Sequence, residues 1–167
     1  MKTALCVLAL VLVGSAAAAQ PAIRVVGFSQ LGPYKVDGGT LGAARAAFGR
    51  PAQMRTPKGS CQLAWPGLTI GFYTLLHDKQ CTPDSAFSDA RVTRPWVTDR
   101  GLRQGDTVAR AHSLYPAARK ARPSFARPGS VGLIVRFSPA IGDYGLAAEV
   151  ANGRVTALVL SDPQGGE

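Results

Sequence analysis

Histidine and cysteine, the side chains that most often serve as bases, nucleophiles and metal ligands, are few and widely spaced in this chain. His77 is followed by Asp78, which would allow a histidine–carboxylate pair, and His112 falls on the polar side of an expected helix. The glycines around Ser130 do not have the spacing of a nucleophile elbow, so no activated serine accompanies either histidine. We therefore predict no catalytic residue, and an unrecognised hydrolase built on His77 or His112 is the enzymatic alternative.

Metal and cofactor sites are not predicted either. Zinc requires three or four nitrogen, sulfur or carboxylate ligands, more than two separated histidines can supply. Asp84, Asp89 and Asp99 lack the spacing of a calcium-binding loop. Gly38 and Gly39 lack the lysine and hydroxyl residue of a phosphate-binding loop. We therefore expect no metal and no cofactor.

The N-terminus has the pattern of a secretory signal. Lys2 precedes an uninterrupted apolar run from Ala4 to Val13, and the small residues that follow include Ala17 to Ala19. This pattern predicts a signal peptide over residues 1–19, cleaved near Ala19, and a mature chain without a transmembrane segment. We expect the protein to be secreted or to lie in the cell envelope.

The cysteines predict one disulfide. Cys6 lies inside the apolar run and would leave with the signal, so that Cys61 and Cys81 remain. An even number of cysteines in an exported chain favours a bond between them. The bond would close a loop of about 20 residues, for which loop-closure entropy stabilises the fold by about 3 kcal/mol.

Basic residues dominate the middle of the chain. The formal net charge is +9, and most of it falls between Arg91 and Arg127, where the acids are Asp99 and Asp106. Such a concentration of charge attracts polyanions, for example cell-wall polymers. A solvated surface accounts for the same pattern equally well. The candidate polyanion-binding residues are Arg119, Lys120, Arg122 and Arg127.

A segment of the chain occurs twice. Residues 38–49 recur with substitutions as residues 105–116, a shift of 67 positions. Each copy predicts a short helix with one apolar face, and Asp106 is the expected N-cap of the second helix. The residues on these faces are Leu41, Ala44 and Phe48 in the first copy and Val108, Ala111 and Tyr115 in the second.

Strand-like runs follow each copy. Those after the first are at 61–65, 68–76 and 90–93; those after the second are at 131–137, 145–150 and 154–160, the last two joined by an Asn152-Gly153 hairpin. Because so short a helix must lie on a sheet, we predict an α+β fold of two tandem units, 20–95 and 96–161. Each unit is a helix on about three antiparallel strands. Residues 23–28 are expected to form an edge strand or arm, Trp96 to pack between the units, and 162–167 to form a flexible tail.

The residues also carry a resemblance to known proteins. The run from Gly101 to Thr107, with Ser60-Cys61 ahead of Trp65 and Trp96 before the second copy, resembles secreted proteins of high-GC Gram-positive bacteria. The repeated helix-and-sheet unit is similar to that of the β-lactamase inhibitory proteins and, singly, to the BamE-type envelope lipoproteins. The resemblance implies a protein that binds other proteins. The sparse aromatics and basic middle depart from the tandem inhibitors, so the resemblance extends to the fold and not to inhibition.

These observations together predict an exported, non-enzymatic protein that binds another protein in the cell envelope or the medium. The alternative partner is a polyanionic wall polymer. Aromatic residues dominate interface energetics when they are exposed, although the same residues can equally form the core. The candidate protein-binding residues are Trp65, Phe72, Tyr73 and Tyr144.

Overall fold

The structure, a computed structural model, describes residues 21–57, 60–73, 81–121, 128–135 and 144–161. The predicted signal, the predicted tail, His77, Arg122 and Arg127 lie outside these residues. Strands make up 49% and helices 13% of what is described, so the chain is mostly β.

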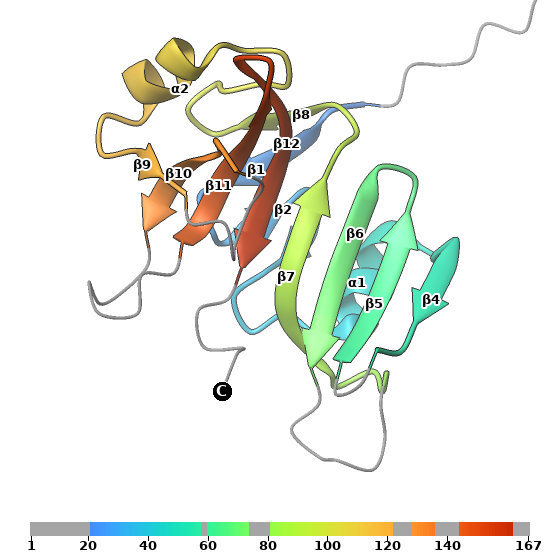
Figure 1. Cartoon of the computed structure of the whole chain (residues 1–167). Helices are drawn as coiled ribbons and strands as arrows, with labels where there is room; N and C mark the ends of the chain where they lie inside the picture. Colours follow the sequence, from blue (N-terminus) through green and yellow to red (C-terminus); the bar gives the residue numbers. More distant parts are fainter. Residues whose placement is uncertain (1–20, 58–59, 74–80, 122–127, 136–143, 162–167) are drawn as a thin grey trace, which may run out of the picture.

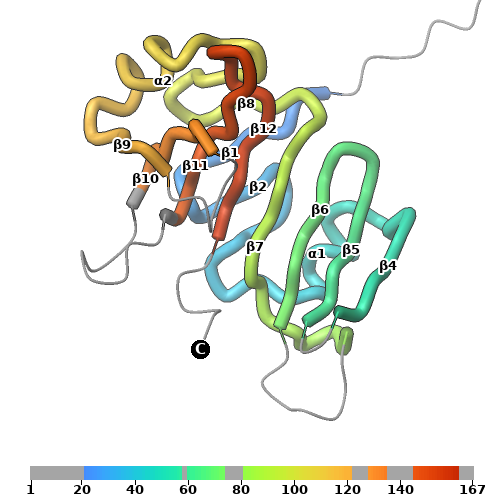
Figure 2. Tube along the Cα trace, viewed as in Figure 1, coloured from blue at the N-terminus to red at the C-terminus, as the bar shows by residue number. Residues whose placement is uncertain are grey.

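Most strands belong to one antiparallel sheet of eight, in the order β4-β5-β6-β7-β12-β11-β10-β9 (Figure 1). Their bounds are β4 Gln53–Arg55, β5 Ser60–Trp65, β6 Leu68–Tyr73, β7 Ala86–Val92, β9 Arg119–Lys120, β10 Val131–Val135, β11 Tyr144–Ala151 and β12 Arg154–Ser161. The tube trace shows that the two sequential series of strands meet in the middle, where β7 lies beside β12 (Figure 2).

A second, smaller sheet has the order β3-β2-β1-β8, with β1 Ile23–Val26, β2 Gln30–Leu31, β3 Tyr34–Lys35 and β8 Trp96–Thr98. β1 is an interior strand, paired antiparallel with β2 and parallel with β8, so the expected edge strand or arm is wrong. Ile23 and Val25 of β1 are buried, and an interior place in the sheet leaves neither side of the strand as an unpaired edge.

The prediction of an α+β fold with two units of a helix on three strands is therefore wrong. Antiparallel pairs from Leu158 and Val92 to Ser161 and Asp89 join β12 to β7, which makes one continuous sheet out of the strands of both expected units. Pairing these strands satisfies backbone groups that two separate units would have left unpaired at their edges. The four strands of the smaller sheet make up a second sheet that the prediction did not contain.

The core lies against one face of the large sheet. Alternate residues of β5, namely Cys61, Leu63 and Trp65, are buried on this inner face, as are Leu158 and Leu160 of β12. The smaller sheet and its loops supply the opposite wall. Aromatic contacts tie the layers together through the pairs Tyr34–Phe48, Tyr34–Phe87, Phe28–Phe87 and Phe48–Trp65.

Both expected helices are present, as α1 (Leu41–Phe48) and α2 (Val108–Leu114). Thr40 caps α1 by accepting from the Ala43 amide, and Thr107 caps α2 by accepting from the Arg110 amide, at matching places in the two similar segments. Asp106 is not the N-cap. Its carboxylate instead accepts from the Arg103 amide at 2.8 Å and closes the preceding turn. Whether the two segments arose by duplication stays a prediction.

Two local predictions are confirmed. Cys61 and Cys81 form a disulfide that joins β5 to the turn before β7, and such a bond indicates an oxidising, extracytoplasmic environment. Asn152 and Gly153 both have positive φ, 51° and 71°, in the turn between β11 and β12. Within the described ranges, none of the helices has the length and apolar character needed to cross a membrane.

Candidate functional site: the outer face of the large sheet

The predicted aromatic anchors are divided between the core and the surface. Trp65 and Phe72 are 7% and 0% exposed on the inner face, and Trp65 Nε1 donates to the Gly49 carbonyl at 3.1 Å. They are therefore core residues that cannot serve as surface anchors. Tyr73 is partly exposed on the outer face. Tyr144 begins β11, and its side chain lies outside what the structure describes.

The outer face of the large sheet is built from small and polar side chains. One row can be followed through the strand register across all eight strands, as Gln53, Ala64, Thr69, Arg91, Val159, Ala147, Gly132 and Arg119. Over β4 to β7 the members of this row are at least partly exposed, whereas Val159, Ala147 and Gly132 are buried. On the β4–β7 part, α1 lies behind the sheet and no helix covers the face turned to the viewer (Figure 1).

A β-bulge interrupts this face at its centre. Gly71 pairs with Asp89 and Phe72 with Phe87, so that Ser88 is the extra residue in β7. Bulges re-aim side chains and often lie beside binding sites. Here the Asp89 carboxylate lies across Gly71, where a Cβ would overlap it. A Cβ at position 71 would therefore force the Asp89 carboxylate to move.

The burial of the Asp89 carboxylate is offset by few interactions among the described residues. Burial raises the pKa of its carboxyl group, and a 3.0 Å hydrogen bond donated by Ser88 Oγ acts in the opposite direction. Ser88 is the only side-chain partner recorded for this carboxylate among the described residues. A partly buried carboxylate can accept several hydrogen bonds, so Asp89 retains acceptor capacity toward a donor that approaches this face.

Arg91, two residues after Asp89 in β7, forms an ion pair. Its guanidinium crosses β12 to the Glu149 carboxylate on β11, with Nη2–Oε2 at 2.6 Å and Nε–Oε2 at 3.1 Å. The Glu149 side chain is 5% exposed and that of Arg91 is 37% exposed. This charge-assisted pair neutralises Arg91 and fastens the two series of strands to each other on the outer face. Of these two charged residues of β7, Arg91 is thus paired with an acid within the sheet.

The rest of the basic stretch is dispersed. Arg94 lies 5.9 Å from the Phe48 ring centroid, and burial lowers its pKa. Arg100 lies 4.9 Å from the Tyr115 ring centroid, near α2. Arg119 and Lys120 are exposed on β9, and His112 is exposed on α2. Arg91 and Arg94 therefore do not belong to a single basic surface with the later residues.

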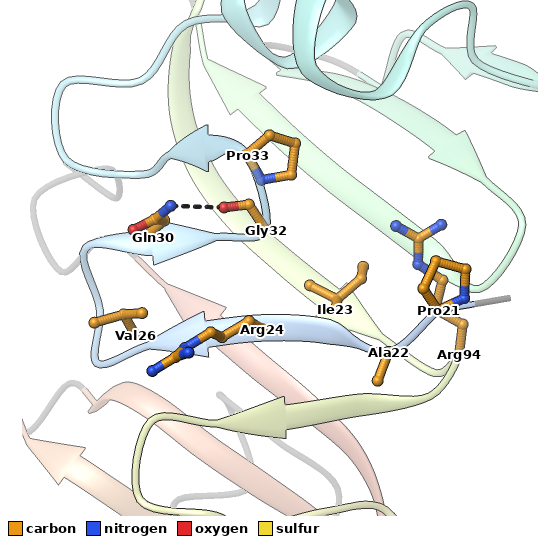
Figure 3. A pocket seen from close by; sticks show the side chains of 9 residues that line it. All are labelled: Pro21, Ala22, Ile23, Arg24, Val26, Gln30, Gly32, Pro33 and Arg94. Carbon is orange, nitrogen blue, oxygen red and sulfur yellow. Dashed lines mark hydrogen bonds between the residues drawn. The ribbon is translucent and has the colours of Figure 1, made fainter.

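A depression of about 520 Å³ lies beside β1 and β2 (Figure 3). Its polar groups do not converge. Gln30 Nε2 donates to the Gly32 carbonyl at 2.8 Å, while Arg24 and Arg94 stand at separate places along the wall. The arrangement gives no common point at which a ligand would meet several polar groups, unlike an ordinary small-molecule site.

Sequence reasoning missed the bulge. The available signal was Gly71, since an isolated glycine inside a strand pattern indicates a bulge or a close approach. Asp89 was considered only as a calcium ligand. Within the described ranges, no group of three or more His, Cys, Asp or Glu side chains is arranged to hold a metal ion.

Comparisons with known proteins give no relative for this architecture. No protein-family model matches the chain, and no curated protein or solved structure matches it either. The resemblance to tandem inhibitory proteins is untested by these comparisons.

Proposed function

We propose that this chain is an exported binding protein that holds another protein on the outer face of β4–β7. The observation that carries the proposal is the Asp89 carboxylate, which the bulge sets on the outer face and for which Ser88 is the one side-chain partner recorded in the described part of the chain. Burying part of a carboxylate without a cation is unfavourable. A partner that brings a lysine, arginine or amide donor to Asp89 would remove this penalty on binding.

The residues around Asp89 support this role. Gln62 of β5 pairs with Gly71, and Thr69 and Tyr73 lie on the same face of β6. All three are partly exposed, and together they offer an amide, a hydroxyl and an aromatic ring. Tyrosine is enriched at protein interfaces because its ring is large and its hydroxyl can hydrogen-bond.

The disulfide supports an extracytoplasmic location, where we propose that the partner is also found, in the cell envelope or the medium. The role is one of binding and not of catalysis.

Site-specific crosslinking tests the proposal. A photoreactive amino acid at Gln62 or Thr69, on the outer face, is compared with one at Arg45, exposed on α1 behind the sheet. We expect a discrete protein adduct from the outer-face positions, which weakens about tenfold or more with Asp89→Ala, the scale of one charge-assisted hydrogen bond. Equal adducts from Arg45, or an adduct that is indifferent to Asp89→Ala, would exclude this face as the binding surface.

A further inference from the structure

A second surface, remote from the outer face of β4–β7, concentrates uncompensated positive charge around α2. We call it the α2 end and define it by Arg100, Arg103, Arg110, Arg119 and Arg154. We propose that the α2 end binds a linear phosphate polyanion. The inference is independent of the proposed protein-binding face, because it uses none of the residues around Asp89.

Backbone contacts hold the segments of the α2 end together. The Gly105 amide donates to the Val155 carbonyl and the Val155 amide to the Asp106 carbonyl, both at 2.8 Å. An isolated bridge links Thr107 to Arg154, so the β11–β12 hairpin lies against the start of α2. Four residues after α2 the chain enters β9, the edge strand of the large sheet, beneath α2 in Figure 1.

Two cations of the α2 end, Arg100 and Arg154, are held by neutral groups. Arg100 Nη1 donates to the Leu114 carbonyl at 3.3 Å while its guanidinium lies over the Tyr115 ring. Arg154 Nη1 donates to the Gly105 carbonyl at 2.9 Å. Neutral acceptors orient a guanidinium without cancelling its charge, in contrast to Arg91, which Glu149 neutralises. These two arginines are thereby positioned in advance for an anion.

Acids compensate little of this charge. Among the described residues, the acids on the segments that carry these arginines are Asp99 and Asp106, and the Asp106 carboxylate accepts from the Arg103 amide. Among the described residues, the side chains of Arg103, Arg110 and Arg119 are exposed and have no recorded ion pair. Arg103 also lines a shallow depression of about 500 Å³ beside Trp96 and Gly105, which extends the surface. The result is a positive field on one end of the molecule.

The chemistry of the surface selects the class of polyanion. All five of its cations are arginines, whose planar guanidinium matches phosphate in two parallel hydrogen bonds. Single-stranded nucleic acid would use exposed aromatic rings for stacking. The described rings at this end are buried: Tyr115, beneath Arg100, is 1% exposed and Trp96 is 2% exposed.

A membrane surface fits the α2 end less well. Peripheral helices insert large apolar side chains between lipid headgroups. Within the described ranges the large hydrophobic residue that is exposed is Met54, on β4 at the opposite edge of the large sheet. A flexible phosphate chain without bases or lipid tails therefore fits best.

The test measures the affinity of the full-length chain, purified after export, for inorganic polyphosphate over a series of salt concentrations. Arg103→Gln/Arg110→Gln/Arg119→Gln is compared with Arg45→Gln/Arg50→Gln/Arg55→Gln, which removes the same charge near α1 and β4. We expect the α2-end variant to bind at least about tenfold more weakly and its log–log salt slope to fall by about 2, since each phosphate contact contributes about 0.7. The control variant should stay within about twofold of the parent chain.

Equal losses in the two variants would show that net charge alone attracts the polymer and would overturn the proposal. So would the absence of binding, or tighter binding to vesicles of anionic lipid or to single-stranded DNA at the same salt concentration. Thermal unfolding of each variant separates a lost contact from a lost fold. Asp89→Ala should leave polyphosphate binding unchanged, so failure of either proposal can be recognised separately.

Discussion

Asp89 makes the folded chain sensitive to pH. Burial raises the pKa of its carboxyl group above the value near 3.9 of an unfolded chain, so the folded state holds this proton more tightly. Between the two pKa values the folded state binds more protons than the unfolded state, and its stability falls as the pH rises. Above the folded pKa this loss is complete. An acid that lowers stability is typical of a functional site, where stability is given up for binding.

Asp89→Asn should therefore stabilise the protein at neutral pH. The amide has nearly the shape of the carboxylate and can still accept from Ser88 Oγ, but it carries no charge to desolvate. Urea unfolding from about pH 4 to about pH 8 should show higher stability for the variant at the upper end and convergence with the parent at the lower end. A variant less stable than the parent at neutral pH would mean that the ionised carboxylate has a stabilising partner.

Gly71→Ala should destabilise the protein through Asp89. The added methyl group overlaps the carboxylate, and overpacking of this kind costs about 1–3 kcal/mol. Asp89→Ala opens the space, so the double variant should be less destabilised than the sum of the single ones. Additive losses would place the strain in the backbone and not in the contact with Asp89.

The sequence located some of these residues and not others. Trp65 and Phe72 were considered as surface anchors because an aromatic in an alternating strand suits either face of a sheet until its neighbours are known. Asp89 became significant only through its pairing with Gly71, a residue far enough away in the chain that no local pattern connects the two. The disulfide was predictable because pairing two remaining cysteines requires no knowledge of the fold.

At the scale of elements, the two helices and the longer strands could be predicted, whereas the strands of two or three residues could not. The apolar faces of α1 and α2 and the alternation in β5, β6 and β12 carry a periodic signal. β2, β3 and β9 have two residues each, and β4 and β8 three, too few for any periodicity. Such short strands form because they pair with a neighbouring strand. β9 accordingly lies outside every strand-like run that the sequence predicts.

The two threonine caps give the prediction that belongs to the helices. Thr40→Ala and Thr107→Ala should each lower the free energy of unfolding by about 1 kcal/mol, because each removes the acceptor of a first-turn amide. Urea unfolding measures the loss. Thr93→Ala is the matched control, since Thr93 is exposed between β7 and β8 and its hydroxyl has no hydrogen bond recorded to any described residue. A loss as large at Thr93 would show that the caps contribute nothing particular.

At the scale of the whole molecule, the join between β7 and β12 organises the fold. It brings residues 89–92 into register with residues 158–161, and it puts the two series of strands in one sheet. Local sequence gave the strands on each side but not this pairing, because either series could have ended in a free edge or paired with the smaller sheet. The tandem arrangement expected from the similar segments was wrong for that reason.

Variants of the Arg91–Glu149 ion pair measure how strongly the two series of strands are coupled. The Arg91 guanidinium on β7 reaches across β12 to the Glu149 carboxylate on β11. Arg91→Gln should lower stability more than Glu149→Gln, because Glu149 is buried while Arg91 can turn toward water. The double variant Arg91→Gln/Glu149→Gln should show a coupling of about 1–3 kcal/mol in a double-mutant cycle.

Hydrogen exchange distinguishes an ion pair that holds β7 to β12 from one that acts only locally. If the pair holds the halves together, either single variant should speed amide exchange at Ala90 and Val92 of β7 and at Leu158 and Leu160 of β12, the residues that pair across the join. The Leu63 and Ala64 amides of β5, a strand separated from β7 by β6, serve as the internal reference. Faster exchange spread equally over both groups would mean that the pair stabilises the fold globally, and that the backbone pairing of β7 with β12 needs no ionic support.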